Sequence, residues 1–143
     1  MTSETRALAG DLALAVVRLT RHLRGRRTDS RVSLTQLSAM STLSQDGAMT
    51  PGALAAREKV QPPSMTRVIA SLNDLGLVER TPHPTDGRQI IVDLSEAGRE
   101  LLRDEAQARE AWLTERLQQL DQKSLDTLRD AVGILTTLVT EDK

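Results

Sequence analysis

The order of helix and turn signals in the middle of the chain constrains the fold more than any other feature. Thr50 followed by Pro51 is typical of a helix N-cap with proline at the first helical position, and opens a helix of about two turns. Pro62 and Pro63 fit only at or before the first turn of a second helix, which Gly76 ends. The apolar residues of this second helix repeat at helical spacing: Met65, Val68, Leu72 and Leu75. Together these signals predict a helix-turn-helix.

The periodicity of the apolar residues changes after this second helix. Residues 77–81 and 89–94 are short runs that favour β-strands, and the connecting residues 82–88 contain two prolines and a glycine. This pattern predicts a β-hairpin, which makes the helix-turn-helix a winged one. We therefore expect a mainly α fold with a small β-hairpin wing.

Helices are also predicted on both sides of this unit. Residues 8–23 carry an apolar stripe at helical spacing, and residues 33–36 have the pattern of a capping box. Ser95 predicts the N-cap of another long helix, and a last helix starts at Asp121 or Ser124. The apolar residues of this last helix alternate steps of three and four, the spacing of a packing seam: Leu125, Leu128, Val132, Leu135 and Val139.

The composition excludes several classes of function. The 143-residue chain has no cysteine, and therefore no disulfide, thiolate metal site or cysteine nucleophile. His22 and His83 lie too far apart in the chain to suggest a metal site, and the sequence has no glycine-rich phosphate loop or nucleophile elbow. No segment resembles a membrane span or a signal peptide. We expect a cytoplasmic protein that is not an enzyme, requires no cofactor and does not associate with a membrane.

The net charge of −1 conceals an asymmetry along the chain. Residues 1–95 carry 12 basic and 9 acidic side chains, a net charge of +3, whereas residues 96–143 carry 7 basic and 11 acidic side chains, a net charge of −4. This asymmetry is compatible with one end facing DNA and the other turned away. A basic cluster near the N-terminus fits phosphate tracking, an anionic ligand's pocket or a solvated helix end: Arg18, Arg21, Arg24, Arg26, Arg27 and Arg31.

Two groups of residues in the helix-turn-helix are candidates for contact with DNA. Opposite its apolar face, the second helix carries short polar side chains and one arginine, which fit the major groove. These residues are Pro63, Ser64, Thr66, Arg67 and Ser71. Arg57 and Lys59, in the connection between the helices, are placed to contact phosphates. An ordinary solvated helix face is the alternative for the first group.

The hairpin tip supports a sharper prediction. Asp86, Gly87 and Arg88 lie where a hairpin turn projects farthest, and an arginine there can enter a narrow minor groove. Asp86 does not favour phosphate, so we expect it to pair with an arginine and fix the shape of the wing. A merely polar hairpin tip is the alternative.

These motifs resemble those of the MarR (multiple antibiotic resistance regulator) family of winged-helix transcription factors, and the likeness covers essentially the whole chain. The residues that match its recognition-helix pattern are Leu54, Ala55, Val60, Ser64, Thr66, Arg67, Leu72, Leu75, Gly76, Leu77, Val78 and Arg80. Those that match its wing pattern are Asp86, Arg88, Leu94, Ser95, Glu96 and Gly98. The chain departs from the family at Gln61, Pro62 and Pro63, where a serine or threonine cap and a polar pair are commoner.

The resemblance implies a homodimeric repressor that binds a palindromic operator in double-stranded DNA. On this basis residues 1–31 form an N-terminal dimerisation helix, residues 32–98 the winged DNA-binding domain, and residues 99–143 the C-terminal dimerisation helices of a single compact chain. It also implies release by a small ligand. We expect a small organic anion or lipophilic compound that binds between the dimerisation helices and the winged domain.

Two other classes of function stay open at this point. A helical protein–protein interaction module, which uses the winged helix without specific DNA binding, fits the near-neutral net charge. A steep fall of DNA affinity with salt would argue against it. An enzyme subunit that borrows the fold has support only from the basic cluster near the first helix, and needs a pocket with perturbed titrating groups.

Overall fold

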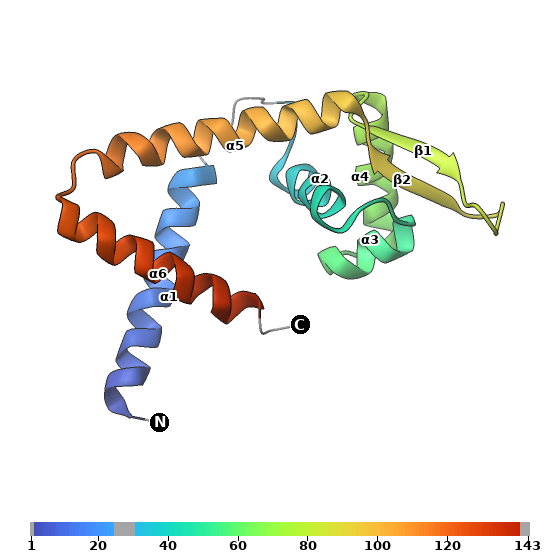
Figure 1. Cartoon of the computed structure of the whole chain (residues 1–143). Helices are drawn as coiled ribbons and strands as arrows, with labels where there is room; N and C mark the ends of the chain where they lie inside the picture. Colours follow the sequence, from blue (N-terminus) through green and yellow to red (C-terminus); the bar gives the residue numbers. More distant parts are fainter. Residues whose placement is uncertain (1, 25–30, 141–143) are drawn as a thin grey trace. The chain divides into compact units, whose positions relative to one another are not determined.

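Helices make up most of the described chain, and a two-stranded hairpin interrupts their order (Figure 1). The computed structural model describes residues 2–24 and 31–140. Its elements are α1 (Ser3–Arg24), α2 (Leu34–Asp46), α3 (Pro51–Glu58), α4 (Pro62–Asp74), β1 (Val78–Pro82), β2 (Ile90–Leu94), α5 (Glu96–Leu117) and α6 (Gln122–Thr140). The predicted fold class is confirmed. The chain divides into two units, Met1–Ala108 and Arg109–Lys143, which are described separately.

Side-chain caps begin α2 and α3 where the sequence predicted them. The Ser33 amide donates to Gln36 Oε1 at 2.7 Å, and the Gln36 amide donates to Ser33 Oγ at 3.2 Å. At α3, the Ala53 amide donates to Thr50 Oγ1 at 3.2 Å. Each cap satisfies amides that have no partner in the first helical turn, which typically stabilises a helix by about 1 kcal/mol. Gln61, before α4, makes no such side-chain bond.

One apolar core lies among α2, α3, α4, the hairpin and the start of α5. Its buried members are Val32, Ala39, Met40, Leu43, Met49, Leu54, Ala55, Met65, Ile69, Leu72, Leu77, Val78, Val92, Leu94 and Leu101. In α4, Met65 and Leu72 are buried as predicted, but Val68 and Leu75 are only partly buried. The predicted face omitted Ile69, which is 3% exposed and lies between Met65 and Leu72 at helical steps of four and three.

The wing is an antiparallel hairpin that is tied to the helix-turn-helix at its root. β1 and β2 pair in register from Val78 opposite Leu94. In the connection between α2 and α3, the Met49 amide donates to the Val92 carbonyl at 3.1 Å and the Val92 amide donates back at 2.8 Å. These bonds fix the root, while the tip projects away from α2, α3 and α4 (Figure 1).

The hairpin passes into α5 through a tightly packed junction. Ser95 Oγ donates to the Gly76 carbonyl oxygen at 2.6 Å and accepts from the Gly98 amide at 3.0 Å, so Ser95 caps α5 as predicted. Gly98 packs so closely that a Cβ there would overlap the Leu77 carbonyl oxygen. Gly76 has a φ of 75°, in the left-handed region that favours glycine, and ends the α4 segment.

The helices α1 and α6 contain no buried residue among those described. The exposed large apolar residues of α1 are Leu8, Leu14, Val16, Val17 and Leu19, and those of α6 are Leu128, Val132, Ile134, Leu138 and Val139. Before α6, Asp121 Oδ1 accepts from the Ser124 amide at 2.8 Å, and this hydrogen bond lowers the pKa of Asp121. Within the described segments, no helix combines the length and apolarity that crossing a membrane requires.

Candidate nucleic-acid interface

The exposed face of α4 carries most of the residues that we predicted to contact bases. Pro63, Thr66 and Arg67 are exposed, and Ser64 is half-buried. Arg67 Nη2 donates to Ser64 Oγ at 3.3 Å, and the Thr66 hydroxyl donates to the Pro62 carbonyl oxygen at 3.0 Å. These weak, exposed contacts leave the side chains accessible for contact with a groove.

Ser71 is placed differently from the rest of this set. Its hydroxyl donates to the Val68 carbonyl oxygen at 2.8 Å and accepts from Gln36 Nε2 of α2 at 2.7 Å, so this half-buried serine joins α4 to α2. Ala70, by contrast, is exposed one turn after Thr66, on the same face of α4. The sequence pattern does not single out Ala70, because a single alanine carries no polar or charged signal.

The first turn of α4 offers few backbone donors. Pro62 and Pro63 lack an N–H group, and the Met65 amide already donates to the Gln61 carbonyl oxygen at 3.0 Å. Of the first three helical positions, only Ser64 keeps an amide that can donate to a phosphate. The first turn of α4 therefore offers mainly side chains, and few backbone donors, to a binding partner.

Arg57 and Lys59, the predicted phosphate contacts, lie in the last turn of α3 and directly after it. Arg57 Nη1 forms an ion pair with Asp46 Oδ2 of α2 at 2.8 Å, with the Arg57 side chain 52% exposed. Lys59 has a φ of 54° and a ψ of 44°. This left-handed conformation costs a residue with a Cβ about 1–2 kcal/mol. Sequence analysis missed it because lysine, unlike glycine, does not signal such a turn.

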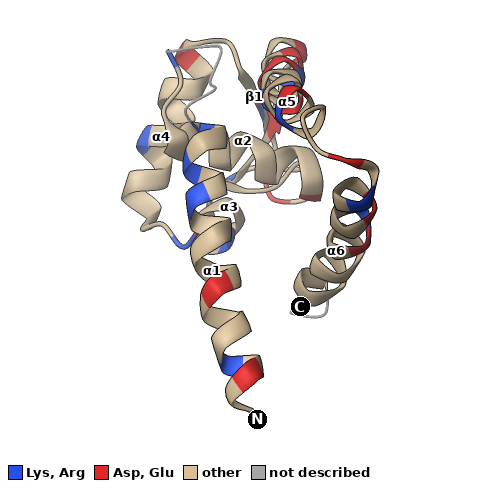
Figure 2. Ribbon diagram, turned by 90° about the vertical axis from the view of Figure 1, so that its left-hand side faces the viewer, with Lys and Arg blue, Asp and Glu red and all other residues tan. Residues whose placement is uncertain are grey.

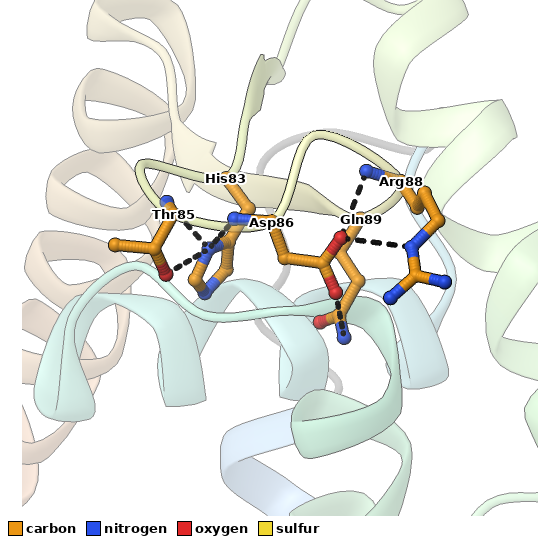
Figure 3. Close-up of polar contacts among 5 residues, drawn as sticks. All are labelled: His83, Thr85, Asp86, Arg88 and Gln89. Carbon is orange, nitrogen blue, oxygen red and sulfur yellow. Dashed lines mark hydrogen bonds and ion pairs between the residues drawn. The ribbon is translucent and has the colours of Figure 1, made fainter.

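The wing tip has the predicted pair of an aspartate and an arginine (Figure 3). Asp86 Oδ1 accepts from the Arg88 amide at 3.1 Å and from Arg88 Nε at 3.2 Å, and Asp86 Oδ2 accepts from Gln89 Nε2 at 3.4 Å. The Arg88 side chain is 91% exposed, and the contact drawn between its guanidinium group and the carboxylate is made by Nε (Figure 3). Asp86 thus orients Arg88 through Nε and leaves its terminal nitrogens accessible.

His83 also belongs to this tip, which sequence analysis did not predict. Its Nδ1 accepts from the amides of Thr85 and Asp86, both at 3.1 Å (Figure 3). The sequence pattern led us to consider His83 only as a metal ligand. An imidazole that accepts backbone amides has no sequence pattern of its own.

A hollow of about 420 Å³ lies between the first turn of α3 and the wing. Its lining residues are Thr50, Pro51, Gly52, Arg88, Gln89 and Ile90. Arg88 is the one charged residue among them. The hollow therefore places the wing arginine and the start of α3 along one surface.

The candidate contacts form two groups in residues 32–98, which we call the winged unit. The α4 residues and the connection at Arg57 and Lys59 lie together because α3 and α4 are consecutive, packed helices, whereas the wing tip stands apart on its hairpin (Figure 1). In the N-terminal basic cluster, Arg18, Arg21 and Arg24 lie on α1, where Figure 2 shows basic residues. Arg26 and Arg27 lie outside the described residues.

Known proteins resemble this chain across the winged helix-turn-helix and beyond it. Residues 32–90 match the model of the MarR family. An HTH-type transcriptional regulator of Mycobacterium bovis is 58% identical over 134 residues, which span 94% of each chain. A solved structure from Pseudomonas aeruginosa has a TM-score of 0.87 at 30% identity and covers 97% of this chain and 98% of that chain.

A more distant structure shares the fold alone. It is NadR in complex with 4-hydroxyphenylacetate, with a TM-score of 0.62 at 21% identity, covering 87% of this chain and 89% of that chain. The family match spans the helix-turn-helix and most of the wing, and the M. bovis relative extends the likeness over nearly the full length. The chain therefore belongs to the MarR family and is a DNA-binding transcriptional regulator.

Proposed function

We propose that this protein is a cytoplasmic repressor of transcription that binds an imperfect palindromic operator as a homodimer. The observation that carries the proposal is Arg88, which is 91% exposed at the wing tip while Asp86 holds its Nε. An arginine presented in this way suits a narrow minor groove, where the potential is most negative. We assign the chain no catalytic activity and no cofactor.

The exposed face of α4 is proposed to read the major groove. Ser64 and Thr66 offer hydroxyl groups to base edges or phosphates, and Arg67 reaches guanine or a phosphate. Pro63 and Ala70 present small apolar surfaces that suit the methyl group of thymine and let the helix approach closely.

The phosphate contacts are proposed to flank this helix. Arg57 and Lys59 contact the backbone beside α4, and the backbone next to the minor groove passes over the hollow between α3 and the wing. Gly87, without a side chain, lets the wing tip approach the sugar edges. Ser71 and Asp86 act by holding α4 and the wing in shape.

The homodimer is proposed to bury the apolar faces of the terminal helices, in the regions 1–31 and 99–143. Each of α1 and α6 exposes several large apolar side chains in the single chain. Two-fold dimers are the commonest soluble oligomers, and a two-fold axis presents two α4 helices to half-sites about one helical turn of DNA apart.

The proposed effector is a small organic anion or lipophilic compound. The fold neighbour NadR was solved with 4-hydroxyphenylacetate, which is such an anion. In this chain a hollow of about 470 Å³ lies between the end of α2 and the start of α5. Apolar residues and two arginines line it together with Asp93, which pairs with Arg99 at 3.3 Å: Leu43, Leu102, Ala106, Arg99 and Arg103. A ligand that binds one spacing of the two α4 helices better than another shifts the dimer away from operator register.

Fluorescence anisotropy with duplex from the gene's own upstream region tests the proposal. We expect wild type to prefer this duplex over an unrelated one, with a steep salt dependence, and Arg88→Ala to lose about 1–3 kcal/mol. The matched control is Arg129→Ala, because Arg129 forms a comparable exposed ion pair with Asp126 on α6 at 3.0 Å. Binding that is weak, sequence-blind and indifferent to Arg88 would contradict the proposal and favour an interaction module. Transcription in vitro that rises when the protein is added would contradict repression.

A further inference from the structure

The wing tip is built around one ring nitrogen of His83 (Figure 3). Its Nδ1 accepts from the Thr85 amide and the Asp86 amide, both at 3.1 Å, and lies 3.3 Å from Thr85 Oγ1. The His83 amide donates across the hairpin to the Gln89 carbonyl oxygen at 3.1 Å. The ring therefore satisfies two consecutive amides of the turn from within the turn itself.

This contact requires one protonation state. A nitrogen that accepts from two amides must carry a lone pair, so the ring proton resides on Nε2 and the imidazole is neutral. Asparagine makes a similar bond to the amide two residues ahead, in an Asx turn, and its Oδ1 stands at the same distance from Cβ as histidine Nδ1. Histidine differs because it becomes a double donor in acid. A protonated ring would point an N–H group at both amides.

The same turn holds Arg88. Asp86 donates its amide to His83, and its carboxylate accepts from the Arg88 amide at 3.1 Å and from Arg88 Nε at 3.2 Å. His83 therefore fixes the backbone of the residue that orients Arg88. If the Asp86 amide loses its acceptor, the carboxylate that guides Arg88 is no longer held in place.

We propose that His83 is a positioning residue for Arg88, which holds the wing tip as a neutral imidazole and releases it when protonated. Operator affinity should then be lower in acid, where the ring is protonated, than at neutral or basic pH. The effect on affinity rests on the proposed DNA contact of Arg88. The effect on the conformation of the wing tip does not depend on DNA binding.

The charged neighbours at the tip act on a protonated His83 in opposite directions. At the tip they are Asp86, which attracts an imidazolium, and Arg88, which repels it. Glu79 and Arg80 of β1 and Asp93 of β2 lie nearer the root of the hairpin. The start of α3, which shares a hollow with Arg88, contributes a threonine, a proline and a glycine, none of which titrates.

A simple charge argument predicts the opposite sign, which makes the inference testable. A histidine that merely faced DNA would gain a positive charge in acid and bind phosphates more tightly. If protonation of His83 releases the wing tip, operator binding should instead become weaker in acid. The direction of the pH dependence therefore separates a positioning histidine from a phosphate contact.

Three proteins should be compared by anisotropy on the same operator duplex between pH 8 and pH 5.5: wild type, His83→Asn and His83→Ala. Asparagine keeps an acceptor that does not titrate, and His22, the other histidine, is present in all three. We expect the Kd of wild type to rise about threefold to tenfold over this range, in line with the loss of one or two hydrogen bonds. His83→Asn should match wild type at pH 8 and stay within about twofold of its own pH 8 value in acid, while His83→Ala should bind more weakly at both limits.

Two outcomes would overturn the inference: wild type binds more tightly in acid, or wild type and His83→Asn share one pH profile. A second readout needs no DNA. In the free protein, the amide chemical shifts of Thr85 and Asp86 should follow the titration of the His83 ring and stay constant in His83→Asn. If no operator is bound at any pH, the proposed function fails, and the amide shifts alone decide whether His83 holds the tip. If the operator is bound but these amides ignore pH, the inference fails and the proposed function stands.

Discussion

The winged unit and the terminal helices differ in how their apolar side chains are covered. In the winged unit, Leu54 and Leu72 are fully buried within the chain. On α6, a continuous helix of 19 residues, Val132 is 60% exposed and Val139 is 73% exposed. The winged unit therefore buries its apolar side chains within its own core, whereas α1 and α6 each expose large apolar side chains, a surface that is typical of association.

The side-chain hydrogen bonds also differ between the two regions, in the sequence distance that they span. In the winged unit, side chains join segments far apart in sequence, as Gln36 does with Ser71 and Ser95 with Gly76. On α6 the side-chain bonds are local, such as those of Asp126 with Gln122 and Arg129. Local bonds of this kind stabilise a helix by only a few tenths of a kcal/mol, about 0.2–0.5 each. On α6, these side-chain hydrogen bonds therefore contribute little to tertiary order.

The strongest test of this contrast removes the same kind of side chain from each region. Leu72→Ala, at a site with no exposure, should lower the free energy of unfolding by about 2–5 kcal/mol, because it removes buried apolar area and leaves a cavity. Ile134→Ala, at a site 63% exposed and off the predicted seam of α6, should change it by less than about 0.5 kcal/mol. Urea unfolding followed by circular dichroism measures both. Equal losses would show that the two regions do not differ in this way.

The next test places a charge on the exposed apolar face of α6. Val132→Asp should weaken the dimer by about 2–4 kcal/mol, because association would bury the carboxylate, while the winged unit stays folded. Sedimentation velocity over a range of protein concentrations measures the shift. Thr137→Asp, on the opposite side of α6, is the control and should leave the dimer intact. A Val132→Asp protein that stays dimeric at the lowest concentrations would place the interface elsewhere.

Glycine-to-alanine substitutions provide a test with a smaller expected effect, because Gly98 lies in a tightly packed junction whereas Gly133 has no neighbouring atom within 4 Å of an added Cβ. Gly98→Ala should destabilise the protein by about 1–3 kcal/mol, since the new Cβ meets the Leu77 carbonyl oxygen and cannot be accommodated without a backbone shift. Gly133→Ala on α6 meets no atom within 4 Å and should stabilise the helix by up to about 1 kcal/mol. Thermal unfolding of the two variants should therefore shift in opposite directions.

Sequence signals that act over three or four residues were enough to predict much of the winged unit. The capping box at Ser33, the cap at Thr50 and the cap at Ser95 each occur as the local pattern indicates. The pairing of Asp86 with an arginine was also predicted, and in the structure that arginine is Arg88, two residues ahead in the same turn. These features need no knowledge of distant parts of the chain.

The features that sequence analysis missed depend on the backbone or on distant partners. Ile69 was omitted because helical spacing alone does not decide which edge of an apolar face meets the core. Ser71 turns toward Gln36, 35 residues away, which periodicity does not reveal. Lys59 and His83 adopt roles that glycine and asparagine fill more often, and residue type therefore conceals them. The proposed roles of α1 and α6 in dimerisation depend on a second chain, which the sequence pattern of one chain does not specify.

The smallest change in stability is expected at Lys59. Its strained backbone lowers the stability of the winged unit, while its charge is proposed to bind a DNA phosphate. Lys59→Gly should stabilise the winged unit by about 0.5–1 kcal/mol, because glycine adopts the left-handed conformation without a Cβ penalty. The same change should weaken operator binding and reduce the slope of log K against log salt by about 0.9, as expected for one lost phosphate contact. Lys123→Gly, in the first turn of α6, has an ordinary helical backbone and should lose stability instead, by up to about 1 kcal/mol. If Lys59→Gly gains stability with no change in the salt slope, Lys59 is strained without contacting DNA, and the phosphate contacts of the turn reduce to Arg57. If both change as expected, the turn keeps a strained lysine because its charge is needed at the DNA.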